Sequence, residues 1–391
     1  MKVLIDKSDR LQKAPQALLG VMRLTEKSFK ARGLEHIDLD SIVPELPDHL
    51  PFIEAIRQEN LAPATPAGET DTVALKEAIA EIYSGIYGRP IHPVKEIALT
   101  PGSRSTIVLL CLGMLNPDNV VALPDPGLAM YRLGAIMAGA TPLAYPLLEK
   151  NDYLPNINSL LERPPRNLRL IIMNYPHIPT GAEADLFFYR DLLGRLRRHN
   201  ILVALDCPFI GQIEPPIELP LQLRKAAKHV IELHSFGIPY GLNGLGFAIG
   251  HPGAIAVLNQ VADICGFHPF QSQIKYALLG LKYHSELAAL FAQKISERRR
   301  ILGDGLRELG WKIRAARQGP FIWAKIPSRA TSVGFARKMF IRTGVRARAG
   351  SDFGEHGEGY LRLSLTADIG ILEKALENIR KDAGMHQKRR D

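Results

Sequence analysis

The chain has 391 residues, of which 46% are hydrophobic, so it can bury a substantial core and is expected to form two lobes. Its formal charge of +9 is spread along the sequence without a zinc pattern or a basic motif interleaved with aromatic residues, which argues against nucleic acid as a partner. No apolar run is long enough to span a membrane, and the first residues do not form a secretory signal. A cytoplasmic protein without membrane attachment is therefore expected.

The three cysteines, Cys111, Cys207 and Cys265, are odd in number and do not have the spacing of a metal site. They are typical of reduced, mostly buried thiols in a cytosolic chain. Neither a disulfide framework nor a bound metal is expected.

The first 60 residues are expected to form an arm that joins the second lobe. From residue 61 to about 285, apolar runs of strand length alternate with helical patterns, which predicts an α/β domain with a mostly parallel sheet and helices on both faces. The strands are predicted at 120–123, 168–173, 202–205, 230–233 and 246–249. Helices are predicted at 103–115, 130–138 and 185–199.

From about residue 273 to 309 the pattern is long and helical, and it predicts the connection between the two lobes. Short strands are predicted beyond it at 311–313, 321–326 and 360–364, followed by a final helix at 369–382. These elements indicate a smaller α+β domain. The predicted division is therefore 1–60 for the arm, 61–285 for the large domain and 286–391 for the small domain.

One segment, Ile231–Gly250, reads Ile-Glu-Leu-His-Ser-Phe-Gly-Ile-Pro-Tyr-Gly-Leu-Asn-Gly-Leu-Gly-Phe-Ala-Ile-Gly. It resembles the lysine-bearing stretch of class I and II aminotransferases, the fold type I enzymes that use pyridoxal phosphate. Further similar landmarks follow the family's order at 100–105, 125–131, 174–181, 205–209 and 350–364. The resemblance implies a fold type I architecture, with a large mostly parallel-sheet domain and a smaller α+β domain.

The resemblance also implies which polar anchors remain. Gly102, Ser103 and Arg104 match the turn that cradles the cofactor's phosphate, and a helix N-terminus suits an anion because its N–H groups and dipole face it. The other three matches are Ser235 as a phosphate ligand, Asp206 as the partner of the pyridine nitrogen, and Arg362 as the clamp for a substrate carboxylate.

Other family positions carry residues that cannot do the family's chemistry. Ile238 stands where the lysine that forms the Schiff base is expected, and an isoleucine is neither a nucleophile nor a base. The remaining replacements are Leu128 for a stacking aromatic, Ile178 for an asparagine, Phe209 for a tyrosine and Pro63 for a tyrosine lent by a partner subunit. The phosphate-binding arginine is replaced by Gly246 on a direct count, or it is lost in a two-residue deletion within 245–247.

These losses together predict a weak cofactor site. The missing hydrogen bonds and ring stack sum to on the order of 5 kcal/mol, or more than a thousandfold in affinity. We therefore expect a homodimeric pseudoenzyme that has lost transamination and does not hold pyridoxal phosphate tightly. Its apolar cleft, with Asp206 at a raised pKa and Arg362 at the rim, would then bind a small carboxylate ligand or a protein partner.

Three alternatives remain open at this stage. The chain is an active aminotransferase, or another enzyme of this family, that uses a non-standard base; or it runs a cofactor-free reaction in the same cleft; or it is a regulatory subunit of an active paralogue. Lysines elsewhere in the region, at 225, 228, 275 and 282, do not have the required strand-end position. His177 and His234 lie near the site in sequence, but structural roles are favoured for both.

Overall fold

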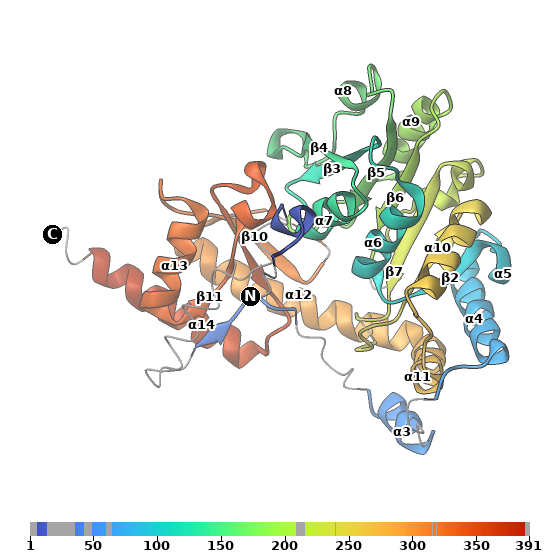
Figure 1. The fold of residues 1–391 in the computed structure, drawn as a ribbon. Helices are drawn as coiled ribbons and strands as arrows, with labels where there is room; N and C mark the ends of the chain where they lie inside the picture. Colours follow the sequence, from blue (N-terminus) through green and yellow to red (C-terminus); the bar gives the residue numbers. More distant parts are fainter. Residues whose placement is uncertain are drawn as a thin grey trace, which may run out of the picture.

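The computed structural model describes residues 6–13, 36–42, 49–59, 65–208, 216–238, 240–314, 316–317 and 319–387. Figure 1 shows a large body around one sheet and a smaller body around another, with the long helix α12 (His284–Glu308) passing between them. Leu287 of α12 packs in the core of the large body, and Leu302 packs in the core of the small one. The helix therefore connects the two cores, as the long helical pattern predicts.

The large sheet has seven strands in the order β2-β8-β7-β6-β5-β3-β4. Strand β8 runs antiparallel to both of its neighbours, and the other pairings are parallel. This confirms the mostly parallel α/β sheet expected from the sequence. The strands are β2 (Ile97–Thr100), β3 (Val120–Asp125), β4 (Thr141–Pro146), β5 (Leu168–Asn174), β6 (Leu202–Asp206), β7 (Val230–Ser235) and β8 (Gly246–Gly250).

Helices cover both faces of this sheet because its strands are apolar on both sides. The adjacent residues Ile171 and Ile172 of β5 are fully buried in different core clusters, since successive side chains of a strand point to opposite faces. One face is covered by α4 (Glu69–Tyr87), α9 (Leu186–Leu196) and α11 (Gln271–Lys282). The other face is covered by α6 (Ser103–Met114), α7 (Ala129–Met137) and α10 (Pro252–Ile264).

The smaller body is built on an antiparallel sheet of order β12-β13-β10-β9. Its strands are β9 (Lys312–Ile313), β10 (Phe321–Lys325), β12 (Arg348–Ala349) and β13 (Tyr360–Ser364), and its helices are α13 (Ser332–Thr343) and α14 (Ile369–Gln387). Strand β1 (Ile37–Asp38) pairs in parallel with β11 (Val345–Arg346), so this part of the N-terminal segment lies against the C-terminal elements. The domain boundaries given above stay predictions.

Two strands of the large sheet lie outside the sequence prediction. Strand β4 is an edge strand whose residues are mostly exposed and include Pro142 and Pro146, so it lacks the apolar signal of a central strand. Strand β2 has only four residues. The shorter helices are α1 (Asp9–Gln12), α3 (Leu50–Gln58), α5 (Pro93–Glu96) and α8 (Ile157–Leu161), with 3-10 turns at Glu149–Asn151, Pro220–Gln222, Ala226–Lys228, Gly350–Phe353 and Glu355–Gly357.

None of the helices in the described ranges has the length and apolar character needed to cross a membrane. The parallel strands β3, β5, β6 and β7 end at one edge of the large sheet, which is where open α/β sheets place their ligands. The predicted site residues that follow these strands are therefore brought together at this edge.

Candidate functional site

A cavity of about 410 Å³ lies at the edge of the sheet where these parallel strands end. Its walls come from the start of α6 and from the loops that follow β3, β5, β6 and β7, with one residue from the N-terminal segment. The lining residues are Ile42, Pro101, Gly102, Ser103, Arg104, Ser105, Leu128, Ile178, Asp206, Pro208, Ser235, Gly237, Ile238, Asn243 and Gly244. Most of the residues predicted from the sequence as site positions are among them.

Asp206, the last residue of β6, is the buried acid of this cavity, with only 1% of its surface exposed. The Tyr131 hydroxyl donates to its Oδ2 at 2.8 Å, and the Asn174 amide donates to its backbone oxygen at 2.7 Å. Its other carboxylate oxygen, Oδ1, has no hydrogen-bond partner among the residues that the structure describes. Because an unpaired buried oxygen is costly, this atom calls for a donor supplied by a ligand.

Burial raises the pKa of the Asp206 carboxyl, as the sequence analysis expected for an acid in an apolar cleft. The hydrogen bond from Tyr131 opposes this effect most strongly, and Ser103, Arg104 and His234 lower the pKa further. A positively charged donor in the cavity would therefore favour the ionised form of Asp206.

The start of α6 forms another part of the cavity wall. Gly102 precedes the helix with a φ of 86°, a left-handed conformation that glycine adopts without strain, and it is followed in the cavity wall by Ser103, Arg104 and Ser105. The side chain of Arg104 is exposed and makes no hydrogen bond or ion pair within the described part of the chain. Free backbone N–H groups, two hydroxyls and an unpaired guanidinium make this part of the wall suitable for an anion.

Gly246, the position where the family's phosphate-binding arginine was expected, has no room for a side chain. A Cβ atom there would lie 2.4 Å from the His234 carbonyl oxygen and 2.8 Å from the Cα of Gly102. The glycine thus allows β8 to pack closely against the start of α6. The cation nearest to the anion cradle in the cavity wall is Arg104 instead.

The remaining wall of the cavity is apolar and is formed by Leu128, Ile178 and Ile238. Ile238 is 8% exposed, and no lysine is found among the described residues that line the cavity. The backbone N–H of Ile178 donates to the Asn174 side chain at 2.6 Å, which fixes this part of the wall. Phe209 and Pro63 lie outside the described residues, so the predictions for them stay untested.

Arg362, the predicted carboxylate clamp, lies on β13 and does not line the cavity itself. Its Nη2 donates to the Asp40 backbone oxygen at 2.7 Å, and its guanidinium packs over the rings of Phe321 and Phe353 at 4.3 and 5.1 Å from their centroids. Burial lowers its pKa to about 10, and its Nε has no partner among the described residues. Asp40, the partner of Arg362, lies two residues before Ile42, which lines the cavity wall.

His177 has a structural role, as the sequence analysis favoured. Its Nδ1 lies 2.8 Å from the Thr180 hydroxyl, and its Nε2 lies 3.0 Å from the Pro126 carbonyl oxygen. Burial lowers its pKa to about 3, so the ring is neutral at physiological pH and both nitrogens are engaged. His177 is therefore not available as a proton carrier.

His234 is also structural, and it belongs to a buried group with Cys207 and Glu232 whose donor types could hold a metal ion. The two oxygens of Glu232 already accept hydrogen bonds from the Tyr83 hydroxyl at 2.7 Å and the Leu221 N–H at 2.9 Å. His234 Nδ1 lies 3.1 Å from the Cys207 carbonyl oxygen. Because protein groups satisfy these atoms, the cluster does not require an ion.

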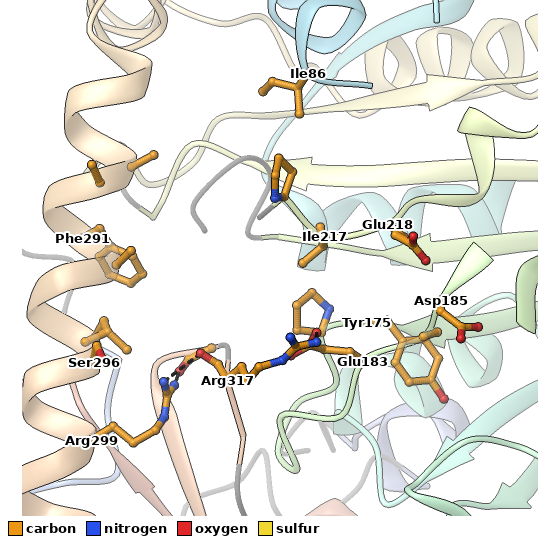
Figure 2. A pocket seen from close by; sticks show the side chains of 18 of the residues that line it. Ile86, Tyr175, Glu183, Asp185, Ile217, Glu218, Phe291, Ser296, Arg299 and Arg317 are labelled. Carbon is orange, nitrogen blue, oxygen red and sulfur yellow. Dashed lines mark hydrogen bonds and ion pairs between the residues drawn. The ribbon is translucent and has the colours of Figure 1, made fainter. Parts of the chain in front are cut away.

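A larger cavity of about 910 Å³ lies between α12 and the loops that follow β5 (Figure 2). Phe291, Ser296 and Arg299 project into it from the helix, and Arg317 spans its floor in an ion pair with Glu183 at 3.1 Å. None of the predicted site residues that the structure describes lines this cavity. The smaller cavity, which contains the unpaired Oδ1 of Asp206, is therefore the candidate site.

Comparisons with known proteins identify the family to which the chain belongs. The family model described as "Aminotransferase class I and II" matches residues 35–379. LL-diaminopimelate aminotransferases of Aquifex aeolicus and Halothermothrix orenii are each 30% identical to the chain, covering 95% and 96% of it and 98% of their own lengths.

Solved structures with a similar fold also cover most of the chain. Substrate-bound BacF from Bacillus subtilis has a TM-score of 0.87 at 27% identity, with 97% of this chain and 98% of that one covered. A probable N-succinyldiaminopimelate aminotransferase from Thermus thermophilus has a TM-score of 0.85 at 26% identity, with 93% and 99% covered.

These findings contradict two expectations from the sequence, namely that transamination has been lost and that pyridoxal phosphate is not held tightly. The relatives that match nearly the whole chain are named as aminotransferases, a class that uses this cofactor. The expectations were wrong because they added up lost contacts one at a time. The cavity keeps an unpaired oxygen on Asp206 and an unpaired guanidinium on Arg104, which such a sum does not include.

Proposed function

Because the chain belongs to the class I and II aminotransferase family, we propose that it is a pyridoxal phosphate or pyridoxamine phosphate enzyme acting on an amino or keto acid. We also propose that it holds the cofactor without a covalent bond to residue 238 and moves protons with a group other than a lysine at that position. Ile238 in the cavity wall supports this second part.

The observation that carries the proposal is the unpaired Oδ1 of Asp206, buried in a cavity of about 410 Å³. A protonated pyridine nitrogen is the donor that this oxygen lacks, and the pairing would be a charge-assisted hydrogen bond. The start of α6, with Arg104, Ser105 and Ser235, would hold the phosphate. The residues present therefore fit both polar ends of the cofactor.

When bound, the cofactor supplies an electron-withdrawing ring that weakens the bonds to the α-carbon of an amino acid. Asp206 would keep the ring nitrogen protonated, because an ionised acid next to it favours the charged form. Leu128 and Ile178 would exclude water from the ring faces. Ile238 cannot accept a proton, so the proton from the α-carbon must pass to another group.

For the substrate, we propose an amino acid or keto acid whose carboxylate is bound by Arg362. The Nε of this side chain has no partner in the described part of the chain, and its Asp40 contact is mainly to a backbone oxygen. The guanidinium therefore keeps hydrogen-bonding capacity for a carboxylate. The curated relatives named above act on diaminopimelate according to their names, which is an amino acid with two carboxylates. A homodimer in the cytoplasm is part of the same proposal.

The proposal is tested by titrating the purified chain with pyridoxal phosphate and pyridoxamine phosphate and following the absorbance and fluorescence of the cofactor. We expect saturable binding of one cofactor per chain, and a spectral change of the bound cofactor when an amino acid substrate is added. Asp118→Asn serves as the control variant for Asp206→Asn, because Asp118 is an exposed acid that precedes β3 and does not line the cavity. The absence of saturable binding to the wild-type chain would contradict the proposal.

A further inference from the structure

We infer that Tyr131 is a positioning residue that holds Asp206 in the orientation and ionisation state needed to bind a protonated ring nitrogen. This inference rests on the proposed function and deepens it, because it assigns the second contact of the acid. Tyr131 lies in the first turn of α7, and its side chain is 1% exposed. Its hydroxyl donates to Oδ2 of Asp206 at 2.8 Å.

The geometry leaves Asp206 only one free oxygen. The Asn174 amide fixes the backbone carbonyl of Asp206, and the Tyr131 hydroxyl fixes Oδ2. Within the described ranges, Oδ1 is the atom left without a partner. A carboxylate held in this way cannot rotate to satisfy Oδ1 by itself without giving up the bond to Tyr131. The tyrosine thus keeps one oxygen directed to the ligand.

The groups that lower the pKa of Asp206 indicate the same role for Tyr131. The groups that face the acid are Tyr131 on α7, Ser103 and Arg104 on α6, and His234 on β7, and all of them lower its pKa against the effect of burial. Tyr131 is the strongest of these opposing groups. Burial and the neighbouring Asp206 raise the pKa of Tyr131 well above its ordinary value, so the hydroxyl stays protonated and remains a donor.

Removing the hydroxyl would therefore have a specific effect on the ring-nitrogen contact. Without the donor, Asp206 would be neutral over a wider pH range, and a neutral acid does not stabilise a charged pyridinium. A contact between the start of α6 and the phosphate would not change. The effect would consequently depend on the ring nitrogen of the ligand and not on its phosphate.

The test compares Tyr131→Phe with the wild-type chain for two ligands, pyridoxal phosphate and its analogue with carbon in place of the ring nitrogen. Since a hydrogen bond to a charged group is worth about 1.5–3 kcal/mol, we expect pyridoxal phosphate to bind Tyr131→Phe at least about tenfold more weakly. The carbon analogue should bind both proteins equally. The acid limb of the pH profile for pyridoxal phosphate binding should also move to higher pH in the variant.

The matched control is Tyr145→Phe, which removes a buried hydroxyl that donates to the Ile172 carbonyl oxygen at 2.7 Å and leaves Asp206 untouched. It should bind pyridoxal phosphate like the wild-type chain. An equal loss of affinity for both ligands in Tyr131→Phe would overturn the inference, because it would show a general structural role.

Two further results separate this inference from the proposed function. If the wild-type chain binds pyridoxal phosphate and Tyr131→Phe binds it equally well, the inference fails and the proposed function stands. If the wild-type chain does not bind it, both are wrong.

Should Tyr131→Phe not fold, fluorotyrosine at position 131 keeps the hydroxyl, and its ¹⁹F resonance should shift when pyridoxal phosphate binds but not when the carbon analogue binds. The same resonance unmoved by pyridoxal phosphate would overturn the inference.

Discussion

Replacing Asp206 by asparagine should stabilise the free protein and weaken its binding of the cofactor. The change is nearly isosteric, and the amide oxygen can still accept the hydrogen bond from Tyr131. Its amide nitrogen would face the cavity in place of the unpaired Oδ1. The variant therefore removes the charge while the packing around it is kept.

The effect on stability follows from the raised pKa of Asp206. An acid with a higher pKa in the folded state is favoured by folding while it is protonated, and this contribution is lost as the pH rises from its ordinary value of 3.8 through the folded value. As the pH rises above 3.8, the wild-type chain is therefore destabilised relative to a chain with a neutral side chain at this position, and asparagine does not have this cost. The melting temperature of Asp206→Asn should exceed that of the wild-type chain at pH 7.5, by a smaller margin at pH 5.

Whereas Asp206→Asn should stabilise the fold, it should weaken the binding of the cofactor. Loss of a charge-assisted hydrogen bond to the ring nitrogen removes about 1.5–3 kcal/mol, which corresponds to roughly a 10- to 150-fold weaker affinity for pyridoxal phosphate. Thermal melts at the two pH values and a cofactor titration at pH 7.5 measure both effects. A variant that is less stable and binds the cofactor as well as the wild-type chain would refute this account of Asp206.

Three other variants probe the rest of the site. Ile238→Lys places an amine in the cavity wall, so borohydride should then attach pyridoxal phosphate to the peptide that contains residue 238, and mass spectrometry that finds no such adduct would argue against this placement. Arg104→Ala should weaken pyridoxal phosphate binding by about tenfold or more while leaving pyridoxal, which has no phosphate, unaffected; equal effects on both ligands would rule out a phosphate contact. Arg362→Ala should raise the dissociation constant of every carboxylate-bearing amino acid that binds but not that of the cofactor, and unchanged amino acid binding in calorimetry would count against the clamp.

Much of the fold was predictable because the central strands are buried on both faces. Strands such as β5 and β6 therefore appear in the sequence as short apolar runs between helical patterns. Strand β4 could not be found in this way, because an exposed edge strand with Pro142 and Pro146 has neither alternation nor an apolar run.

The site was predictable where a residue's role follows from its local motif. Asp206 at a strand end and Gly102–Arg104 at a helix start both line the cavity as expected. The partners of these residues were not predictable, because they come from distant parts of the chain. Tyr131 is 75 positions from Asp206, and Asp40 is 322 positions from Arg362. No local sequence pattern therefore predicts either hydrogen bond.

The expectation that transamination has been lost was wrong because it was drawn from motif positions alone. The missing lysine, arginine and asparagine are visible in a motif, whereas the groups that remain unpaired around the cavity become visible only in three dimensions. Arg104 illustrates this point, since its sequence position indicates a phosphate turn but not that its guanidinium is left without a partner in the described structure.

The central claim is that this cavity holds the cofactor without a covalent bond to the protein, and one measurement tests it most directly. The wild-type chain is saturated with pyridoxal phosphate, treated or not treated with borohydride, denatured, and analysed by mass spectrometry of the intact chain and its peptides. We predict one bound cofactor per native chain and its complete release on denaturation in both samples. A chain that never binds the cofactor, or a peptide that keeps it on a lysine after reduction, would contradict the claim.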